Sequence, residues 1–257
     1  MKILLIDTCG APGSIALADS TRPLAAATLP GRSAAERLVP AIHSLAAQAG
    51  IALHSLDAIA VVHGPGSFTG VRVGLSAAKG LCHALNLPLV AISRLAVLAS
   101  LAEPPARVPY PSRSHRDGWE TQINALLDAG RGEFYSGLYA GGLCLRESLL
   151  TRDQLLAEVS FDETNLADQS REEQPTFVVC EPTVAQSIAA LVPQLVAEPT
   201  AADALPLAIA RIRQCAFDDP ASIDANYLRR TDAEIFAKSV ATAAPHLSPT
   251  RPGTPSR

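Results

Sequence analysis

A glycine-rich loop with the sequence HGPGSFTGVRVG occupies residues 63–74 and follows an apolar run that is typical of a buried strand. A strand, a Gly-Pro-Gly-Ser loop and a helix that begins near Thr69 would place free backbone N–H groups at the positive end of a helix dipole, where anions bind well. The loop lacks the G-x-x-x-x-G-K-[ST] pattern of a P-loop, and Arg72 is its only nearby cation. Phosphate binding is therefore chemically possible here.

This loop has two interpretations. In the first, it is part of a vestigial anion or nucleotide site made of Asp7, Gly64, Gly66, Ser67 and Gly70. In the second, the glycines only permit a tight turn, and Ser67 or Thr69 caps the helix that follows. The chemistry of the loop by itself favours the second interpretation.

Two aspartates end apolar runs at similar places in the two halves of the chain. Asp7 ends KILLID and Asp128 ends INALLD, and turn residues and further apolar runs follow both. The chain is therefore interpreted as two copies of one lobe plan. Two carboxylates that face each other across a cleft could hold a hydrated magnesium ion or act as a general base. The alternative is that each aspartate only starts a turn at the end of a strand.

Other kinds of catalytic site find little support. The six histidines form neither H-E-x-x-H nor H-x-x-x-H, the five cysteines are never spaced C-x-x-C, and Ser67 has no G-x-S-x-G elbow around it. We therefore expect no metal site, no disulfide framework and no serine nucleophile. The cysteines are interpreted as small buried hydrophobic residues.

Composition and charge restrict the possible partners. The formal net charge is −4 and no basic run precedes the last residues, so the chain alone lacks the positive surface that nucleic acid needs. The apolar run from Ile3 to Ile6 is too short for a signal peptide, and no stretch reaches membrane-spanning length. We expect a cytoplasmic protein that does not bind membranes and that meets RNA only with the help of a partner.

The predicted elements alternate in the way that a mixed α/β layer fold requires. Strands are predicted as a three-strand meander within 2–30, at 56–62 and 87–93, as a second meander within 121–151, and at 176–181, with a polar, acidic loop at 162–175. Helices are predicted at 34–49, where Ser33 and Glu36 form a capping box, and at 70–85, 94–102, 182–195 and 202–217. We divide the chain into an N-terminal lobe (1–102), a flexible insertion (103–121), a C-terminal lobe (122–238) whose last helix can pack back on the first lobe, and a disordered tail (239–257).

The predicted helix 70–85 is apolar on two sides. One face carries Val71, Gly74, Leu75 and Ala78, and a smaller face carries Val73, Ala77, Gly80 and Ala84. A helix with two apolar faces must be covered on both. The small residues Gly74, Ala77 and Gly80 would let a second helix approach closely, which indicates an interface with another chain. Burial of both faces within one large lobe is the alternative.

Four segments resemble, in order, the landmarks of the bacterial TsaB (YeaZ) family. They are ILLIDT at the start, HGPGSFTGVRVG in the middle, LLDAGRGEFY at 126–135 and NYLRR at 226–230. The resemblance covers residues 1–100 and 122–235. It implies a two-lobed α/β fold of the actin-like ATPase and sugar-kinase class. It also implies a role in making N6-threonylcarbamoyladenosine at position 37 of tRNAs that read codons beginning with A.

The same resemblance implies a set of partners. Such a chain looks like a degenerate sister of the catalytic subunit TsaD and forms a heterodimer with it through the helices 34–49 and 70–85, while the ATPase TsaE joins the pair. Contact with tRNA would come only through the complex, and the isolated chain could pair with itself. The implied interface consists of Leu38, Ile42, Val73, Gly74, Ala77, Gly80 and Ala84.

Two hypotheses about function follow. TsaD-like subunits carry metal-binding histidines in the helix that corresponds to SAAERLVPAIHSL, which has no histidine pair here. We therefore expect a non-catalytic scaffold subunit that stabilises TsaD and holds no cofactor. The alternative is an active ATP-binding actin-like kinase or ATPase that uses Asp7, Asp128 and the loop Gly64–Gly70. Against it, Glu181 and Pro182 stand where this fold class normally has a glycine-rich turn for adenosine. The chain departs from the family pattern in its long 103–120 insertion and in Ala225, where proline often precedes YLR.

Overall fold

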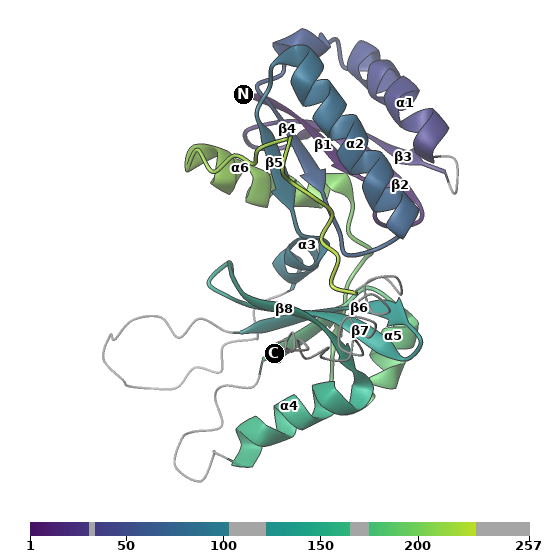
Figure 1. Ribbon diagram of the computed structural model, residues 1–257, viewed down its shortest axis with the longest axis vertical. Coiled ribbons are helices and arrows are strands. Elements are labelled where there is room, and N and C mark those ends of the chain that lie inside the picture. The colour runs from purple at the N-terminus through teal and green to yellow at the C-terminus, as the bar shows by residue number, and fades with distance from the viewer. Residues whose placement is uncertain (31–33, 103–121, 165–174, 230–257) are drawn as a thin grey trace, which may run out of the picture.

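The computed structural model describes residues 1–30, 34–102, 122–164 and 175–229. Two lobes lie one above the other, and each is built on a five-stranded sheet (Figure 1). The predicted insertion 103–121, the tail 239–257 and Ser33 of the predicted capping box lie outside the described residues.

The first sheet contains strands from the beginning of the chain and from the loop region. Its strands are β1 (Lys2–Asp7), β2 (Gly13–Asp19), β3 (Pro23–Leu29), β4 (Ala58–Val62) and β5 (Leu89–Ile92), in the order β3-β2-β1-β4-β5. The pairs β1/β2 and β2/β3 are antiparallel, whereas β1/β4 and β4/β5 are parallel. The predicted meander and the two later strands are confirmed. The continuous apolar runs of β4 and β5 are buried along their whole length, as parallel strands covered on both faces should be.

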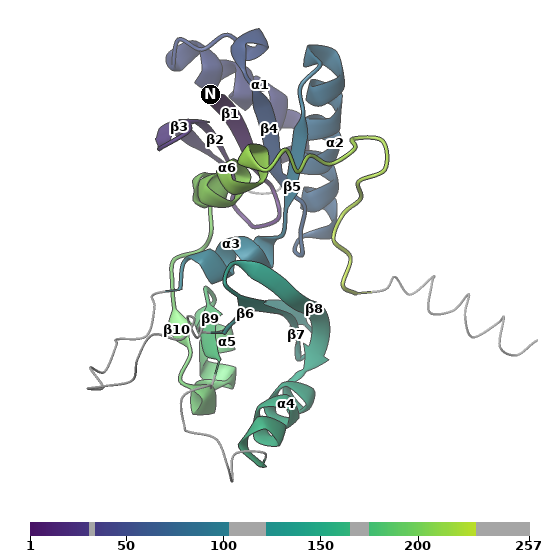
Figure 2. The ribbon, with the colours of Figure 1, turned by 90° about the vertical axis from the view of Figure 1, so that its left-hand side faces the viewer.

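Helices cover both faces of this sheet. The helices α1 (Ala34–Gln48) and α2 (Phe68–Leu85) lie side by side on one face (Figure 1). The short 3₁₀ helix η4 (Ala201–Ala204) and helix α6 (Leu205–Arg213) cover the other face (Figure 2). A further 3₁₀ turn, η2 (Leu53–Ser55), precedes β4. The C-terminal part of the chain thus completes the core of the first lobe.

The second sheet repeats the first. Its strands are β6 (Ile123–Gly130), β7 (Glu133–Ala140), β8 (Leu143–Thr151), β9 (Thr176–Val179) and β10 (Gln194–Leu195). From one edge to the other they run β8-β7-β6-β9-β10, which is the order of the first sheet, with the same sequence of antiparallel and parallel pairs. The expectation of two copies of one lobe plan is confirmed, and so is the two-lobed α/β fold that the resemblance implies.

Alternate residues of the central strands supply two separate cores in the second lobe. Leu126 and Phe177 pack beneath α4 (Arg152–Thr164) and α5 (Pro182–Ser187). Ala125 and Leu127 point the other way, toward α3 (Arg94–Ser100), which lies between the lobes (Figures 1 and 2). The two-residue period of the strands explains this division.

Two sequence predictions about helices are wrong. The single helix predicted at 182–195 is instead α5, a 3₁₀ turn η3 (Ala189–Leu191) and the edge strand β10. Pro193 disfavours the right-handed helical conformation of the residue before it, and Val192 adopts φ 49°. Helix α4 was not predicted, and its last turn enters the stretch 162–175 that was interpreted as a loop.

The cysteines also differ from expectation. Cys9 and Cys82 are buried, as expected, and Cys180 is partly buried, but Cys144 and Cys215 are exposed. Burial raises the pKa of the Cys82 thiol to about 11. No helix within the described residues is long and apolar enough to cross a membrane.

Candidate functional site

The glycine-rich loop connects β4 to α2 and packs against the end of β1. Ser67 is the N-cap of α2, and its hydroxyl accepts the Gly70 N–H at 3.2 Å. A Cβ atom on Gly66 would lie 2.6 Å from the Cys9 carbonyl oxygen, and one on Gly70 would lie 2.0 Å from the Thr8 carbonyl oxygen. These glycines therefore permit the close approach of two backbone segments, and Ser67 caps the helix as one of the two interpretations predicts.

Several backbone groups of the loop and of the first turn of α2 are hydrogen-bonded within the chain. The Ser67 N–H donates to the Cys9 carbonyl at 2.9 Å, and the Val71 N–H donates to the Ser67 carbonyl at 2.8 Å. The Thr8 hydroxyl donates to the Gly70 carbonyl at 2.6 Å. The amides of Ser67, Gly70 and Val71 all have partners within the chain, so they are not left free to hold a phosphate.

The two strand-end aspartates occupy equivalent places in the two lobes but different environments. Asp7 is 2% exposed, and its carboxylate accepts the Cys9 N–H at 2.8 Å. Burial raises the pKa of Asp7, and the positive charge of Arg94 offsets part of that rise. Asp128 is exposed at the wall of the cleft, and its carboxylate accepts the Gly130 N–H at 2.7 Å. The two carboxylates therefore do not form an open pair.

The cleft between the lobes has a volume of about 560 Å³ and contains charged residues that the sequence analysis did not select. Arg94 is 5% exposed, and its Nη2 lies 2.8 Å from Glu198 Oε1. Glu181 accepts the Asp128 N–H at 2.8 Å, and burial raises the pKa of its carboxyl. One signal could have identified Arg94, because it is the single charge in the apolar stretch LVAISRLAVLASLA.

These residues do not fit a bound nucleotide. The carboxylates of Asp128, Glu181 and Glu198 line the cleft, and the guanidinium of Arg94 is paired with one of them. Among the described residues that line the cleft, Arg94 is the one Lys or Arg, so a phosphate group there would meet negative charge that a single, already paired cation offsets only in part. Within the described residues, no group of three or more His, Cys, Asp or Glu side chains is arranged to hold a metal ion. The site therefore gives no support to the kinase or ATPase alternative.

Three residues of the expected partner interface are buried in their own lobe. Leu38 and Ile42 are each 1% exposed, because this face of α1 packs on the sheet. Gly74 is buried as well, and a Cβ atom there would lie 2.3 Å from the Thr8 hydroxyl oxygen. The expectation that these three residues face a partner is wrong. The periodicity of α1 and α2 identified apolar faces but not which of them meets the sheet.

The other four interface residues follow the outer side of α2. Val73 and Ala77 are partly buried, whereas Gly80 and Ala84 are exposed. A Cβ atom on Gly80 would meet nothing within 4 Å. Between α1 and α2 lies a groove of about 570 Å³, and the exposed side chains of Val39 and Phe68 stand along it.

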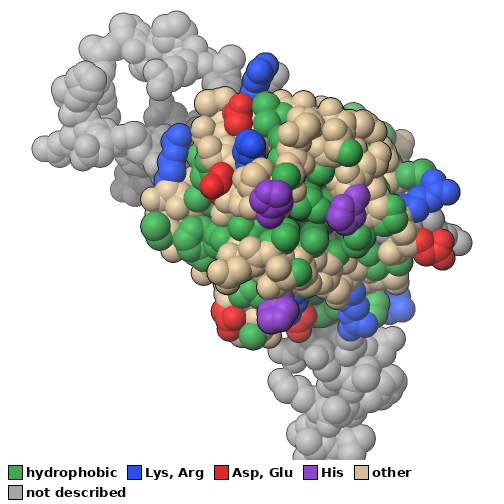
Figure 3. Space-filling view, turned by 90° about the horizontal axis from the view of Figure 1, so that it is seen from above, with side chains coloured by type: hydrophobic (Ala, Val, Ile, Leu, Met, Phe, Trp, Pro, Cys, Tyr) green, Lys and Arg blue, Asp and Glu red, His purple; other side chains and the backbone are tan. Residues whose placement is uncertain are grey.

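The outer end of the first lobe is predominantly uncharged. Viewed from above, hydrophobic side chains and histidines lie across its middle, and most of the acidic and basic side chains lie nearer its edge (Figure 3). This end of the first lobe therefore exposes hydrophobic surface.

A C-terminal segment, the strap, runs from the first lobe to the second and consists here of residues 224–229 (Figure 1). The Asn226 N–H donates to the His63 carbonyl at 2.8 Å, and its side-chain amide donates to Glu147 in the second lobe. Arg229 forms an ion pair with Glu133. The strap thus fastens both lobes, and it contains the NYLR part of the fourth landmark, whose last residue, Arg230, lies outside the described residues.

The strap also makes an aromatic cluster with the start of α2. The Arg72 guanidinium lies 3.7 Å from the centre of the Phe68 ring, and Arg72 Nε donates to the Tyr227 hydroxyl at 2.7 Å. Arg72, the cation that the sequence analysis noted beside the loop, is therefore engaged with aromatic rings.

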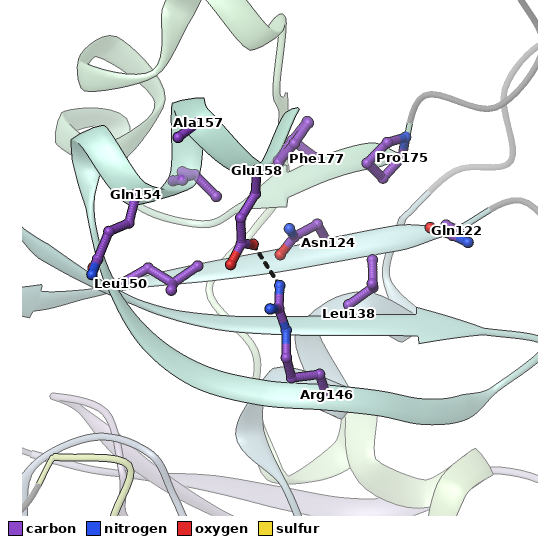
Figure 4. A pocket seen from close by; sticks show the side chains of 11 residues that line it. Gln122, Asn124, Leu138, Arg146, Leu150, Gln154, Ala157, Glu158, Pro175 and Phe177 are labelled. Carbon is purple, nitrogen blue, oxygen red and sulfur yellow. Dashed lines mark hydrogen bonds and ion pairs between the residues drawn. The ribbon is translucent and has the colours of Figure 1, made fainter. Parts of the chain in front are cut away.

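A second hollow lies in the second lobe, between α4 and the sheet. Its volume is about 530 Å³, and Asn124, Leu150 and Phe177 form part of its wall (Figure 4). An ion pair joins Arg146 of β8 and Glu158 of α4, which both line this hollow (Figure 4). The two charged side chains that line it are therefore paired with each other.

Sequence comparisons connect the chain with two related groups of proteins. A family model described as TsaD, tRNA N6-adenosine threonylcarbamoyltransferase, matches residues 28–142. The tRNA threonylcarbamoyladenosine biosynthesis protein TsaB of Bacillus subtilis is 37% identical over 140 residues, which are 54% of this chain and 55% of that protein. TsaB of Escherichia coli is 33% identical over 139 residues, with the same two shares. The chain spans about half the length of the curated relatives it matches.

Structural comparison covers more of the chain. YeaZ from Pseudomonas aeruginosa superposes with a TM-score of 0.65 at 26% identity, over 88% of this chain and 99% of that one. A second structure, of a P. aeruginosa protein described as similar to peptidase YeaZ, gives a TM-score of 0.64 at 28% identity, over 89% of this chain and 99% of that one. The duplicated sheet order, the glycine-rich loop and these likenesses agree: the chain is similar in sequence to TsaB proteins and has the two-lobed α/β fold of YeaZ.

Proposed function

We propose that this chain is a non-catalytic subunit in the synthesis of N6-threonylcarbamoyladenosine at position 37 of tRNA, and that it acts in the cytoplasm. In this role it binds and stabilises the catalytic subunit TsaD. The names of its curated relatives support the pathway, and the match of the TsaD model to residues 28–142 supports kinship with the proposed partner. The ATPase TsaE joins the pair, and tRNA reaches this chain only through the complex.

The observation that carries the proposal is the outer side of α2. Val73, Ala77, Gly80 and Ala84 place small or apolar groups along one line of the helix, and the groove between α1 and α2 continues that surface. Ala77 and Gly80 leave room for the backbone of a second helix to come close. Exposed hydrophobic residues such as Val39 and Phe68 would gain free energy on being covered.

Coexpression with TsaD, followed by size-exclusion chromatography and a binding measurement, tests this surface. Ala77→Glu and Gly80→Arg should weaken the complex roughly 100-fold, because each would place an unpaired charge in a desolvated interface. The open space around Gly80 means that Gly80→Arg need not disturb the chain's own fold. Gly74→Arg is unsuitable, since its side chain would collide with β1.

A matched control separates docking from folding. Ala157→Glu makes the same change at an exposed helical alanine of the second lobe and should leave the complex intact. Normal complex formation by both α2 variants, with their folds unchanged, would overturn the proposal. If the isolated chain is a dimer that both variants convert to monomer without affecting TsaD binding, the surface serves self-association instead.

A further inference from the structure

The hollow between α4 and the second sheet is large enough for a small molecule. Its volume of about 530 Å³ lies within the range of about 300–1,000 Å³ that is typical of ligand pockets. It lies near the starts of β6 and β9, where Gln122 and Pro175 line it. The cleft between the lobes lies near the ends of the same strands, beside Asp128 and Glu181. The hollow and the cleft are therefore separate sites.

The charges that line this hollow balance each other. Arg146 and Glu158 form an ion pair, and they are the two charged side chains among the described residues of its wall. A phosphate group would meet the carboxylate of Glu158, and an ammonium group would meet the guanidinium of Arg146. A zwitterion would have to separate the pair. An uncharged ligand leaves the pair intact, so the wall favours a molecule without charge.

One carboxamide is fixed in the floor of the hollow. Asn124 of β6 is 5% exposed, and its side chain is among those that line the hollow (Figure 4). The buried hydroxyl of Ser136 in β7 donates to Asn124 Oδ1 at 2.9 Å, which sets the orientation of the amide. Two other carboxamides line the hollow, but Gln154 Oε1 accepts the Thr151 N–H at 2.9 Å, and Gln122 is exposed. Asn124 is therefore the preorganised polar group of this site.

A carboxamide presents a hydrogen-bond donor beside an acceptor. It is complementary to an edge that offers an acceptor beside a donor, as Asn and Gln side chains are to N7 and the N6 amino group of adenine. A carbonyl oxygen has two lone pairs, so Asn124 Oδ1 can accept a second hydrogen bond in addition to that from Ser136. Leu150 and Phe177 add apolar wall, which suits the faces of a flat ring.

We propose that this hollow binds an uncharged 6-aminopurine, as the free base or the nucleoside, and that Asn124 pairs with its N6/N7 edge. The base enters between α4 and the sheet, where apolar side chains cover its faces. Because Ser136 already orients the Asn124 amide, little side-chain freedom is lost on binding. The inference concerns the second lobe alone and is independent of the proposed role with TsaD.

Binding of adenosine to the full chain tests the site, measured by isothermal titration calorimetry and by the shift of the thermal unfolding midpoint. We expect a dissociation constant of about 0.1 mM, the order that a ligand of this size reaches without a charged contact. 7-Deazaadenosine lacks the N7 acceptor, and N6,N6-dimethyladenosine lacks the N6 donors. Each should bind at least about tenfold more weakly, because a buried polar group of the site would be left unpaired.

A substitution in the chain provides the matching test. Asn124→Leu removes the carboxamide at similar volume and should weaken adenosine binding at least about tenfold. Gln48→Leu makes the same kind of change at an exposed carboxamide of α1 and should leave the affinity unchanged. The two adenosine analogues act on the unsubstituted chain, so their comparison decides the question even if Asn124→Leu does not fold.

Tighter binding of adenosine than of both analogues, lost in Asn124→Leu and kept in Gln48→Leu, would support the site. The proposal is overturned if adenosine shows no saturable binding at millimolar concentration, or if both analogues bind as tightly as adenosine. Much tighter binding of ATP that Asn124→Leu leaves unchanged would place the ligand in the cleft instead. Binding of L-serine without binding of adenosine would show a site for zwitterions and would equally overturn the proposal.

Discussion

The two lobes share one strand plan but differ in how well their sheets are covered. In the first lobe β4 and β5 are buried along their whole length, because α1 and α2 cover one face and η4 and α6 cover the other. In the second lobe β10, the equivalent of β5, leaves Leu195 55% exposed, and a hollow of about 530 Å³ lies between part of α4 and the sheet. The two sheets therefore share their strand order but not the packing around their strands, because that packing depends on the helices that cover them.

Two of the covering helices pack against the sheet of the other half of the chain. Helix α3 follows the last strand of the first sheet, yet Leu95 and Leu98 belong to the core of the second lobe. Helix α6 follows the last strand of the second sheet, yet Ala208 and Ile209 belong to the core of the first. Each lobe is completed by a helix that the other half supplies.

The largest loss of stability is expected at Gly70, where the backbone of α2 lies against the backbone of Thr8. Gly70→Ala would place a methyl group 2.0 Å from the Thr8 carbonyl oxygen, and neither segment can move without separating α2 from β1. We expect a loss of more than about 4 kcal/mol in the free energy of unfolding, measured by urea denaturation.

Two alanine substitutions calibrate this result. Gly80→Ala, in the same helix but in open space, should stabilise the chain by up to about 1 kcal/mol through helix propensity. Gly137→Ala in the second lobe would place a methyl group 2.8 Å from Tyr139 Cε2 and 2.9 Å from Leu95 Cβ, which is a milder overlap than at Gly70, so its cost should be smaller than that of Gly70→Ala. Equal losses at Gly70 and Gly137 would contradict the contrast between the lobes.

Leu98→Ala tests whether α3 stabilises the second lobe more than the first. Leu98 is fully buried at 0% exposure, and its truncation should cost about 3 kcal/mol. Native-state hydrogen exchange should show the loss of protection first in β6 and β7 and only later in β4 and β5. Loss of protection confined to the first sheet would show that α3 supports its own half of the chain instead.

The smallest predicted change in stability concerns Asp7 and Asp128, which occupy equivalent places in the two lobes. The pKa of Asp7 is higher in the folded chain than its ordinary value of 3.8, chiefly because of burial. The folded chain then binds more protons at this site than the unfolded chain, so the site's contribution to stability decreases as the pH rises from about 4. Asparagine carries no charge at any pH.

The difference in unfolding midpoint between Asp7→Asn and the unsubstituted chain should therefore shift in favour of the variant between pH 4 and pH 7. Asp128→Asn, at the exposed equivalent position, is the matched control and should show a weaker trend. The role assigned to burial would be wrong if both variants gave parallel pH profiles.

Much of the fold was predictable because the strands are nearly pure apolar runs that end in turn residues. The repeated meander, ending its first strand at Asp7 and again at Asp128, identified the duplication. Helix α4 was not predicted because RDQLLAEVSFDET has little apolar periodicity, and among its described side chains Leu155 is the buried one. The predicted helix 182–195 already ends at Ser187, and the proline at 193 explains only why the following 3₁₀ turn stops at Val192.

The site was less predictable because it depends on which residues meet across the lobes. Periodicity identified two apolar faces on α2, but only the close contact with Thr8 shows that Gly74 belongs to the inner one. Arg94 and Glu198 are 104 residues apart in the chain, and no spacing rule connects them. The glycine-rich loop suggested phosphate binding because the sequence does not show that the Ser67 N–H is bonded to the Cys9 carbonyl.

The reciprocal placement of α3 and α6 has a consequence for any attempt to divide the molecule. A cut between residues 102 and 122 would give two fragments, each carrying a helix that fits the other's sheet and lacking the one that fits its own. Neither piece would hold a complete interior by itself, whereas the two together could reassemble. The chain is built of two lobes in space but does not separate into two independent folding units.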